Sequence, residues 1–185
     1  IDYSGKRPQF IDQTTGEVID VELFVAVLGA SSLTYAEATR SQKSVDFIQS
    51  HLHAFEYVGG VPKALVPDQL KSGVTDSCRY EPLVQRTYEE MARHYGTAVV
   101  PYRPAKPKDK AKVERAVQLA QRWILARLRT QTFFSLEALN ERIGELLEDL
   151  NERKMRVYGV SRRELFERTE KAALSSLPLE RFAYA

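Results

Sequence analysis

One run of residues constrains the fold more than any other. Val18 to Leu28 is rich in β-branched and aromatic residues, and from Leu23 onward it contains no polar side chain. Successive side chains of a strand point to opposite faces of a sheet, so a continuously apolar strand must be covered on both sides. The run therefore predicts the central strand of a sheet that is flanked by helices.

The segments around this run predict an α/β domain. Residues 1–11 read as a strand with a kink at Gly5–Pro8, and the turn at 13–17 and an alternating strand at 33–39 complete a three-stranded antiparallel meander. Further elements alternate in type: a helix over 44–58, a strand over 63–67, a helix from about 82 to 95, a strand over 98–100 and a helix from about 107 to 130. This order predicts a mixed five-stranded sheet with helices around it.

Beyond residue 130 the pattern is helical only. Ser135 is placed to cap a helix with a leucine-rich stripe, and Ser161 and Glu164 have the spacing of a capping box. The sequence thus predicts two units, an α/β domain over residues 1–130 and a helical extension over 131–185, with a boundary near residues 131–134.

Composition limits the function classes. The chain has 185 residues, 43% of them apolar and 28% charged, which indicates a folded protein, and a net charge of +2, so any site for a polyanion must arise from local clustering. The single cysteine, Cys78, excludes an internal disulfide and fits a reducing cytoplasm. No apolar run reaches the length that spans a membrane. The chain opens on Ile1 without a methionine, and we expect further domains around it.

The segment from Pro101 to Val117 is a basic, proline-broken run that leads into an amphipathic helix. Two anions accompany six cations, Arg103, Lys106, Lys108, Lys110, Lys112 and Arg115, and Arg122 and Arg129 continue the series from Arg115 at heptad spacing. A cationic loop that feeds a helix is typical of a surface that binds a phosphate backbone. The alternative is a solvated, charged loop.

Three carboxylates lie on neighbouring predicted elements. Asp2 is on the first strand, Asp68 follows the fourth strand and Glu114 is on the helix after the fifth. If the first and fourth strands are adjacent, these side chains converge and suit hard divalent cations. Two strand carboxylates, Asp12 and Asp20, compete with Asp2 and Asp68, and spacing alone does not choose among them.

The element order resembles the RNase H-like fold of DDE transposases and retroviral integrases. More closely, the chain is similar to the transposases of IstA-type insertion sequences. The motifs that carry this resemblance extend over nearly the whole chain: Asp2–Gly5, Val27–Ser32, Tyr57–Pro62, Leu65–Val74, His94–Gly96, Pro107–Glu114, Leu139–Asn140 and Ser161–Phe166.

The resemblance implies an enzyme that cuts and joins DNA strands with two Mg²⁺ or Mn²⁺ ions. It assigns the metal-binding catalytic carboxylates to Asp2, Asp68 and Glu114, while the cations of the basic run and helix would contact phosphates. One departure from the family pattern is Gln69, which stands where asparagine is usual after the second aspartate. The interval from Asp68 to Glu114 is also longer than in retroviral integrases.

The implied partners are transposon-end and target DNA, an AAA+ ATPase helper of the IstB type and further copies of the same protein, in a bacterial cytoplasm near the nucleoid and with no membrane. No phosphate-binding loop of an ATPase occurs in the chain. Two other functions remain open: an RNase H-like nuclease or resolvase without joining activity, and a non-catalytic DNA-binding or assembly module.

Overall fold

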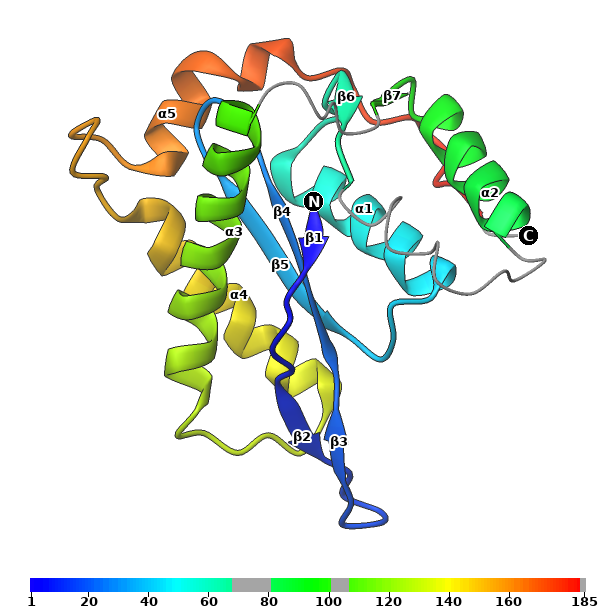
Figure 1. Cartoon of the computed structure of the whole chain (residues 1–185), viewed down its shortest axis with the longest axis vertical. Helices are drawn as coiled ribbons and strands as arrows, with labels where there is room; N and C mark the ends of the chain where they lie inside the picture. Colours follow the sequence, from blue (N-terminus) through cyan, green and yellow to red (C-terminus); the bar gives the residue numbers. More distant parts are fainter. Residues whose placement is uncertain (68–80, 101–106, 184–185) are drawn as a thin grey trace.

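The computed structural model describes residues 1–67, 81–100 and 107–183; within them, the side chains of residues 81–85, 107–113 and 116 are left undescribed. A central sheet separates helices α1 (Ser44–Val58) and α2 (Glu81–His94) from α3 (Pro107–Leu128) and α4 (Leu136–Glu152) (Figure 1). Across the described ranges, no helix combines the length and the apolar character needed to cross a bilayer.

The sheet has an antiparallel and a parallel part. Strands β1 (Asp2–Tyr3), β4 (Glu22–Val27) and β5 (Thr34–Thr39) pair antiparallel in the order β1-β4-β5. Strands β6 (Ala64–Leu65) and β7 (Ala98–Val99) pair in parallel. The main-chain nitrogen of Ile1 donates to the carbonyl of Val66 at 3.2 Å, which places β6 beside β1. The five strands thus lie in the order β7-β6-β1-β4-β5, with β6 and β7 as a two-stranded unit beside the three-stranded sheet, which confirms the predicted mixed α/β fold.

The long apolar run forms two strands, not one. It divides at Val21, whose N–H donates to the Pro8 carbonyl at 3.0 Å. Before this point, β2 (Gln9–Ile11) and β3 (Val18–Asp20) form a separate hairpin that projects from the sheet (Figure 1). The predicted meander is therefore corrected: the kink at Gly5–Pro8 separates β1 from β2, and each half pairs with a different part of the run.

Strand β4 is covered on both faces, as the sequence predicts. Leu23 and Val25 pack with α3 and α4, whereas Phe24 packs in a cluster with Ala54 of α1 and Phe47. All three strand side chains have 0% exposure. The alternation of a strand thus divides the interior into two packed layers.

Local signals explain most helix ends. Gly59, with φ 75°, ends α1, and Gly96, with φ 64°, follows α2, because glycine adopts this left-handed conformation without strain. The Ser135 hydroxyl accepts the N–H of Ala138, and α5 (Arg162–Thr169) begins with the predicted capping box.

The start of α1 agrees with the predicted helix over 44–58 but lacks a capping side chain. Ser44 is the first helical residue and Lys43 occupies the cap position, which lacks a side-chain cap hydrogen bond. Asp46 instead binds the N–H and hydroxyl of Ser41, so the carboxylate in the first turn stabilises the approach to the helix.

The predicted helical segment after residue 130 packs directly on the sheet. The buried stripe of α4 includes Leu139, Ile143 and Leu147 and shares one core with Ile124 of α3 and Val25 of β4. The Trp123 indole N–H also donates to the Leu146 carbonyl at 3.1 Å, which ties α3 to α4. The core therefore continues across residues 131–134, where the sequence suggested a boundary.

The final segment, which includes a short 3₁₀ turn (Lys171–Ala173), returns across the sheet domain. Ser175 forms a two-hydrogen-bond bridge with Val61, and Phe182 packs its ring on His94 of α2. A Cβ atom on Gly60 would lie 2.8 Å from the Ser175 carbonyl oxygen, so only glycine permits this close passage.

Candidate active site

Asp2 is positioned by the register of the sheet. It lies opposite Val25 in the β1–β4 pair, and directly opposed residues share one face of a sheet. Val25 faces α3, so Asp2 faces α3 too, while its neighbour Tyr3 packs edge-to-face on Phe24 on the other side, with ring centroids 5.7 Å apart. One carboxylate oxygen of Asp2 accepts the N–H of Tyr3 at 2.8 Å, which holds the partly buried side chain in place.

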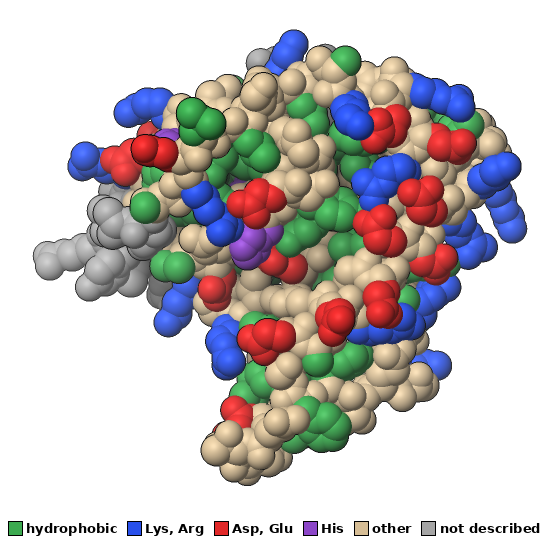
Figure 2. Space-filling model, turned by 180° about the vertical axis from the view of Figure 1, so that it is seen from behind, with side chains coloured by type: hydrophobic (Ala, Val, Ile, Leu, Met, Phe, Trp, Pro, Cys, Tyr) green, Lys and Arg blue, Asp and Glu red, His purple; other side chains and the backbone are tan. Residues whose placement is uncertain are grey.

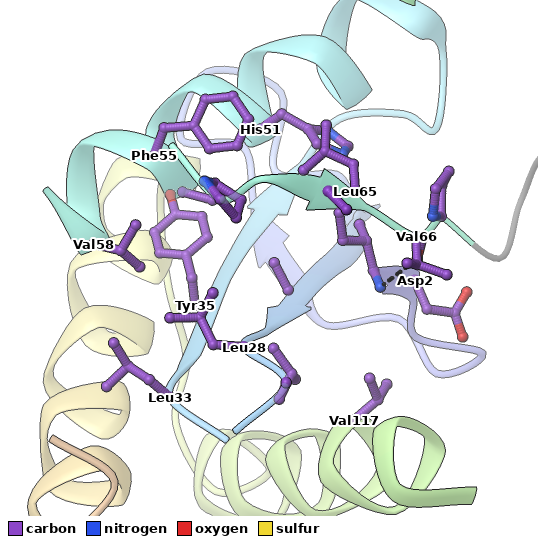
Figure 3. A pocket seen from close by; sticks show the side chains of 18 of the residues that line it. Asp2, Leu28, Leu33, Tyr35, His51, Phe55, Val58, Leu65, Val66 and Val117 are labelled. Carbon is purple, nitrogen blue, oxygen red and sulfur yellow. Dashed lines mark hydrogen bonds between the residues drawn. The ribbon is translucent and has the colours of Figure 1, made fainter. Parts of the chain in front are cut away.

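The end of β6 comes to the same place. Because Ile1 and Val66 are hydrogen bonded, Val66 lies beside Asp2 (Figure 3), and Pro67 lines the same cavity as Asp2. The predicted convergence of the three carboxylates required the first and fourth predicted strands, which are β1 and β6 in the structure, to be neighbours. The hydrogen bond between Ile1 and Val66 confirms that they are. Asp68 follows Pro67 directly in the sequence but lies outside the described residues.

Helix α3 carries Glu114, the third candidate carboxylate. Val117, Ala120 and Ile124 anchor the helix with exposures of 4%, 0% and 0%. Glu114 lies at the edge of this anchored face, and Gln118 and Gln121 follow it at spacings of four and seven residues, so that the three side chains share one stripe. Glu114 is exposed at the surface end of this stripe.

Asp2 and Glu114 line one cavity of about 740 Å³, together with Pro67, Gln118 and Gln121. Other lining residues include apolar side chains of β4 and α1, and Figure 3 shows Phe55 and Val58 of α1 among them. The carboxylate oxygens of Asp2 and Glu114 are the type of ligand that hard divalent cations prefer. Among the residues that the structure describes, which exclude Asp68, no three His, Cys, Asp or Glu side chains are grouped closely enough to hold a metal ion.

The two competing aspartates belong to the β2–β3 hairpin. Asp12 accepts the N–H groups of Thr14 and Thr15 in the turn, which lowers the pKa of its carboxyl group. Asp20 accepts the side-chain amide of Gln9 at 2.6 Å. Neither aspartate lines the cavity of Asp2 and Glu114.

The predicted DNA-contacting cations are only partly described. Arg115 and Arg122 are exposed on α3. Arg103 and Lys106 lie outside the described residues, as do the side chains of Lys108, Lys110 and Lys112, although the last three belong to the backbone of α3.

One contributor to the cavity was missed in the sequence. Glu170 lines its rim from the C-terminal segment and accepts the N–H groups of Ala30 and Ser31 at 2.8 and 2.9 Å. It thereby closes the turn between β4 and β5. Residues about 140 positions apart carry no local pattern that announces such an interaction, so the sequence offered no signal for it.

Comparison with known proteins connects this architecture to mobile DNA elements. No protein-family model matches the chain. A Sinorhizobium fredii protein that carries the name transposase y4bL/y4kJ/y4tB is 53% identical over 184 residues, which is 100% of this chain and 36% of that protein. The transposases of insertion sequences IS1162 from Pseudomonas fluorescens and IS408 from Burkholderia multivorans are 48% and 45% identical over 96% and 100% of the chain, and over 32% and 36% of their own lengths.

Solved structures give the same fold. The catalytic core domain of BIV integrase superimposes with a TM-score of 0.61 at 14% identity, covering 93% of this chain and 97% of that one. The HTLV-2 integrase catalytic core in complex with magnesium superimposes with a TM-score of 0.54 at 15% identity over 89% of this chain and 94% of that one. These likenesses establish the RNase H-like fold of integrase catalytic cores.

The sequence matches run over the whole chain but cover only about a third of each relative, 36% of the Sinorhizobium protein. The resemblance to insertion-sequence transposases that was read from the motifs is thereby confirmed, as is the integrase-like fold. The chain belongs to the insertion-sequence transposase family and has the fold of an integrase catalytic core.

Proposed function

We propose that this chain is the catalytic core of a DDE-type transposase that cuts DNA to release 3′ ends and joins those ends to target DNA. One observation carries the proposal: Asp2 and Glu114, from two different elements, line a single cavity beside the strand end that leads to Asp68. The family relationship supports the same reaction class.

The residues present fit a divalent metal site. The N–H of Tyr3 holds the Asp2 carboxylate in place, and Asp2 and Glu114 both supply hard carboxylate oxygens to the cavity. Asp2, Asp68 and Glu114 are therefore the proposed ligands for two Mg²⁺ or Mn²⁺ ions. When bound, such ions supply activation of the attacking oxygen and stabilisation of the leaving oxygen. The HTLV-2 integrase core, which shares the fold, was solved in complex with magnesium.

The chemistry is two phosphoryl displacements. In cleavage, a water oxygen bonds to the phosphorus while the bond from phosphorus to the 3′ oxygen breaks, leaving a 3′ hydroxyl. In strand transfer, that 3′ hydroxyl attacks a target phosphorus and displaces the target's own 3′ oxygen. The protein's part is to position the phosphate beside the carboxylates, while Arg115, Arg122 and the basic run hold the backbone through charge.

Glu114→Gln tests the assignment, because it removes a ligand charge and keeps the shape of the side chain. In the full-length protein we expect Mg²⁺-dependent strand transfer to fall by roughly 100-fold or more, as expected when transition-state charge stabilisation is lost, with DNA binding unchanged within a few-fold. Glu141→Gln, at an exposed position of α4, is the matched control and retains activity. Near-normal transfer by Glu114→Gln would show that Glu114 is a helix-surface residue.

A pre-cut DNA end separates the remaining functions. A transposase joins such an end to target DNA, whereas a nuclease or resolvase cuts but does not join. A non-catalytic module does neither with any divalent cation, although it binds the DNA.

We propose two kinds of protein partner as well. A helper ATPase of the IstB type is supported by the IS21 transposase of Pseudomonas aeruginosa, which is 25% identical over 77% of this chain. Assembly with further copies is supported by the HTLV-2 integrase core, which was solved in dimeric and trimeric forms.

A further inference from the structure

A second hollow continues from the cavity of the two carboxylates. It has a volume of about 790 Å³, and Gly5, Gln118 and Gln121 line both spaces. Its walls are the segment between β1 and β2 on one side and helix α3 on the other. We call this second hollow the α3 groove; it runs along α3 from the glutamines toward Arg129 and Phe133.

The α3 groove has a one-sided charge. Lys6 and Arg7 stand on the strand side and Arg122 and Arg129 stand on the helix side, and no Asp or Glu among the described side chains lines the groove. All four cations are exposed. On the opposite face of the molecule, in contrast, acidic and basic side chains are interspersed (Figure 2). Although the net charge of the chain is only +2, four basic side chains thus cluster along this groove.

The strand side of the groove is held in shape. Arg7 forms a 2.7 Å ion pair with Glu22 of β4, yet 57% of its side chain remains accessible. The N–H of Lys6 donates to the Ser4 hydroxyl at 3.1 Å, and Ser4 is itself buried with its N–H bonded to the Leu23 carbonyl. These interactions hold the backbone at Lys6 and the side chain of Arg7.

We propose that the α3 groove binds the phosphodiester backbone of the DNA strand that leads to the carboxylate cavity. This proposal rests on the proposed function and adds the path of the substrate: Lys6 and Arg7 on one side and Arg122 and Arg129 on the other bind successive phosphates. Gln118 and Gln121 mark the junction with the cavity and offer amide donors to phosphate or sugar oxygens. Such interactions set the register of the strand and carry no sequence information.

The first test is the salt dependence of DNA binding by the full-length protein. Lys6→Ala and Arg129→Ala each remove one cation, so the slope of log K against log salt should become shallower by about 0.9 for each phosphate of duplex DNA that the variant no longer neutralises. The double variant should show both decrements. Arg7 is left unchanged because its removal would leave the buried Glu22 without this ion pair.

Matched controls are Lys43→Ala and Arg93→Ala, which change exposed cations that line neither hollow. Their slopes should equal that of the wild type. The proposal would be overturned if the groove variants had the same slope as the wild type. It would also be overturned if the control variants showed slopes as shallow as those of the groove variants, because the effect would then be general electrostatic attraction.

The second test locates the strand. In a Cys78→Ser background, Lys6→Cys and Arg129→Cys should form cross-links by thiol–disulfide exchange with DNA that carries a tethered mixed disulfide at phosphates a few nucleotides apart on one strand, with release of the small leaving thiol. Lys43→Cys should form none. Cross-links from Lys6→Cys and Arg129→Cys to different strands, or to none, would overturn the path.

The two proposals fail separately. The Glu114→Gln substitution should leave the cross-links and salt slopes intact while strand transfer is lost. If the groove variants behave like the wild type while Glu114→Gln is inactive, the groove is wrong and the function stands. If the groove variants show the expected shallower slopes while Glu114→Gln still joins DNA, the catalytic assignment is wrong and the groove stands.

Discussion

The two hydrophobic layers on either side of the sheet differ in the kinds of side chain that form them. The layer under α3 and α4 is mainly aliphatic, with Leu23, Val25, Ile124, Ile143 and Leu147 in one continuous core. The layer under α1 and α2 is aromatic: Phe24, Phe47 and Tyr88 surround the imidazole of His51 at ring-centroid distances of 5.3, 4.5 and 5.2 Å.

This difference separates two tasks. The aliphatic layer anchors α3, the helix that carries Glu114, through packing that does not depend on pH. The aromatic layer includes titratable groups in its interior, with His51 at 1% exposure and Tyr88 at 2%. The helix that bears a proposed ligand is therefore fixed by the layer that solution conditions affect least, whereas the layer beneath α1 should respond to acid.

The largest effect is expected in the aliphatic layer. Ile143→Ala leaves a cavity beneath α4, where the side chain has 0% exposure, and should lower the free energy of unfolding by about 2–5 kcal/mol. Urea denaturation followed by circular dichroism measures this change. Leu52→Ala makes the equivalent truncation at 0% exposure in the aromatic layer, and Glu141→Ala on the exposed face of α4 is the neutral control.

A decrease below about 1 kcal/mol for Ile143→Ala would show that α4 is loosely attached and that the cores are not continuous. If only Leu52→Ala is costly, the aromatic layer alone carries the stability of the domain.

The second effect is a decline of stability in acid that originates in the aromatic layer. Burial lowers the pKa of His51 to about 4, and its Nδ1 lies 2.7 Å from the Phe47 carbonyl. The unfolded chain binds a proton near pH 6.5, well before the folded state does. Stability should therefore be complete above pH 6.5 and decline between 6.5 and 4, by on the order of 3 kcal/mol.

NMR titration of the imidazole gives a direct measurement. The His51 signals should not shift until the pH approaches 4. A midpoint near 6.5 would mean that the aromatic layer admits water. In His51→Phe, provided that denaturation remains cooperative, the acid dependence between pH 6.5 and 4 should become smaller.

The smallest effect on stability has the opposite dependence on pH and comes from His53, two residues after His51 in α1. His53 points to the Glu37 carboxylate, with 2.9 Å between Nδ1 and Oε2, and this hydrogen bond raises the pKa of His53. Its contribution to stability is complete below pH 6.5 and is lost as the pH rises through the elevated pKa. Because 40% of the His53 side chain is exposed, solvent screening keeps the contribution small.

A single-residue comparison isolates this pair. His53→Gln should flatten the alkaline side of the stability profile and leave the decline between pH 6.5 and 4 unchanged. Disappearance of the acid decline in His53→Gln would show that His51 is not its source.

Patterns of short range revealed much of this structure from the sequence. The apolar run around Phe24 and the caps at Ser135 and Ser161 are local signals, and the structure confirms each of them in kind. The division of the run at Val21 was not foreseen, because it depends on a bond to Pro8 and on pairing with two separate segments.

The candidate site shows the same limit. Asp2 and Glu114, which the family resemblance singled out, line one cavity, whereas spacing alone left Asp12 and Asp20 as alternatives. The catalytic role of Asp2 and Glu114 remains a prediction. The Lys6–Arg7 side of the α3 groove was not predicted, because no local sequence pattern indicates which helix two adjacent cations in a kink will face. Convergence of Asp68 with the other two remains a prediction.

The bond between Glu170 and the β4–β5 turn has a consequence for synthesis. The two partners, Ala30 and Glu170, are 140 residues apart. At a translation rate of about 5–20 residues per second, roughly 7–28 s separate their appearance on the ribosome. During that interval the nascent sheet lacks the carboxylate that closes this turn and the segment that crosses Gly60. A ribosome-bound chain that ends before Glu170 should thus be more sensitive to protease at the β4–β5 turn than one that extends past Phe182.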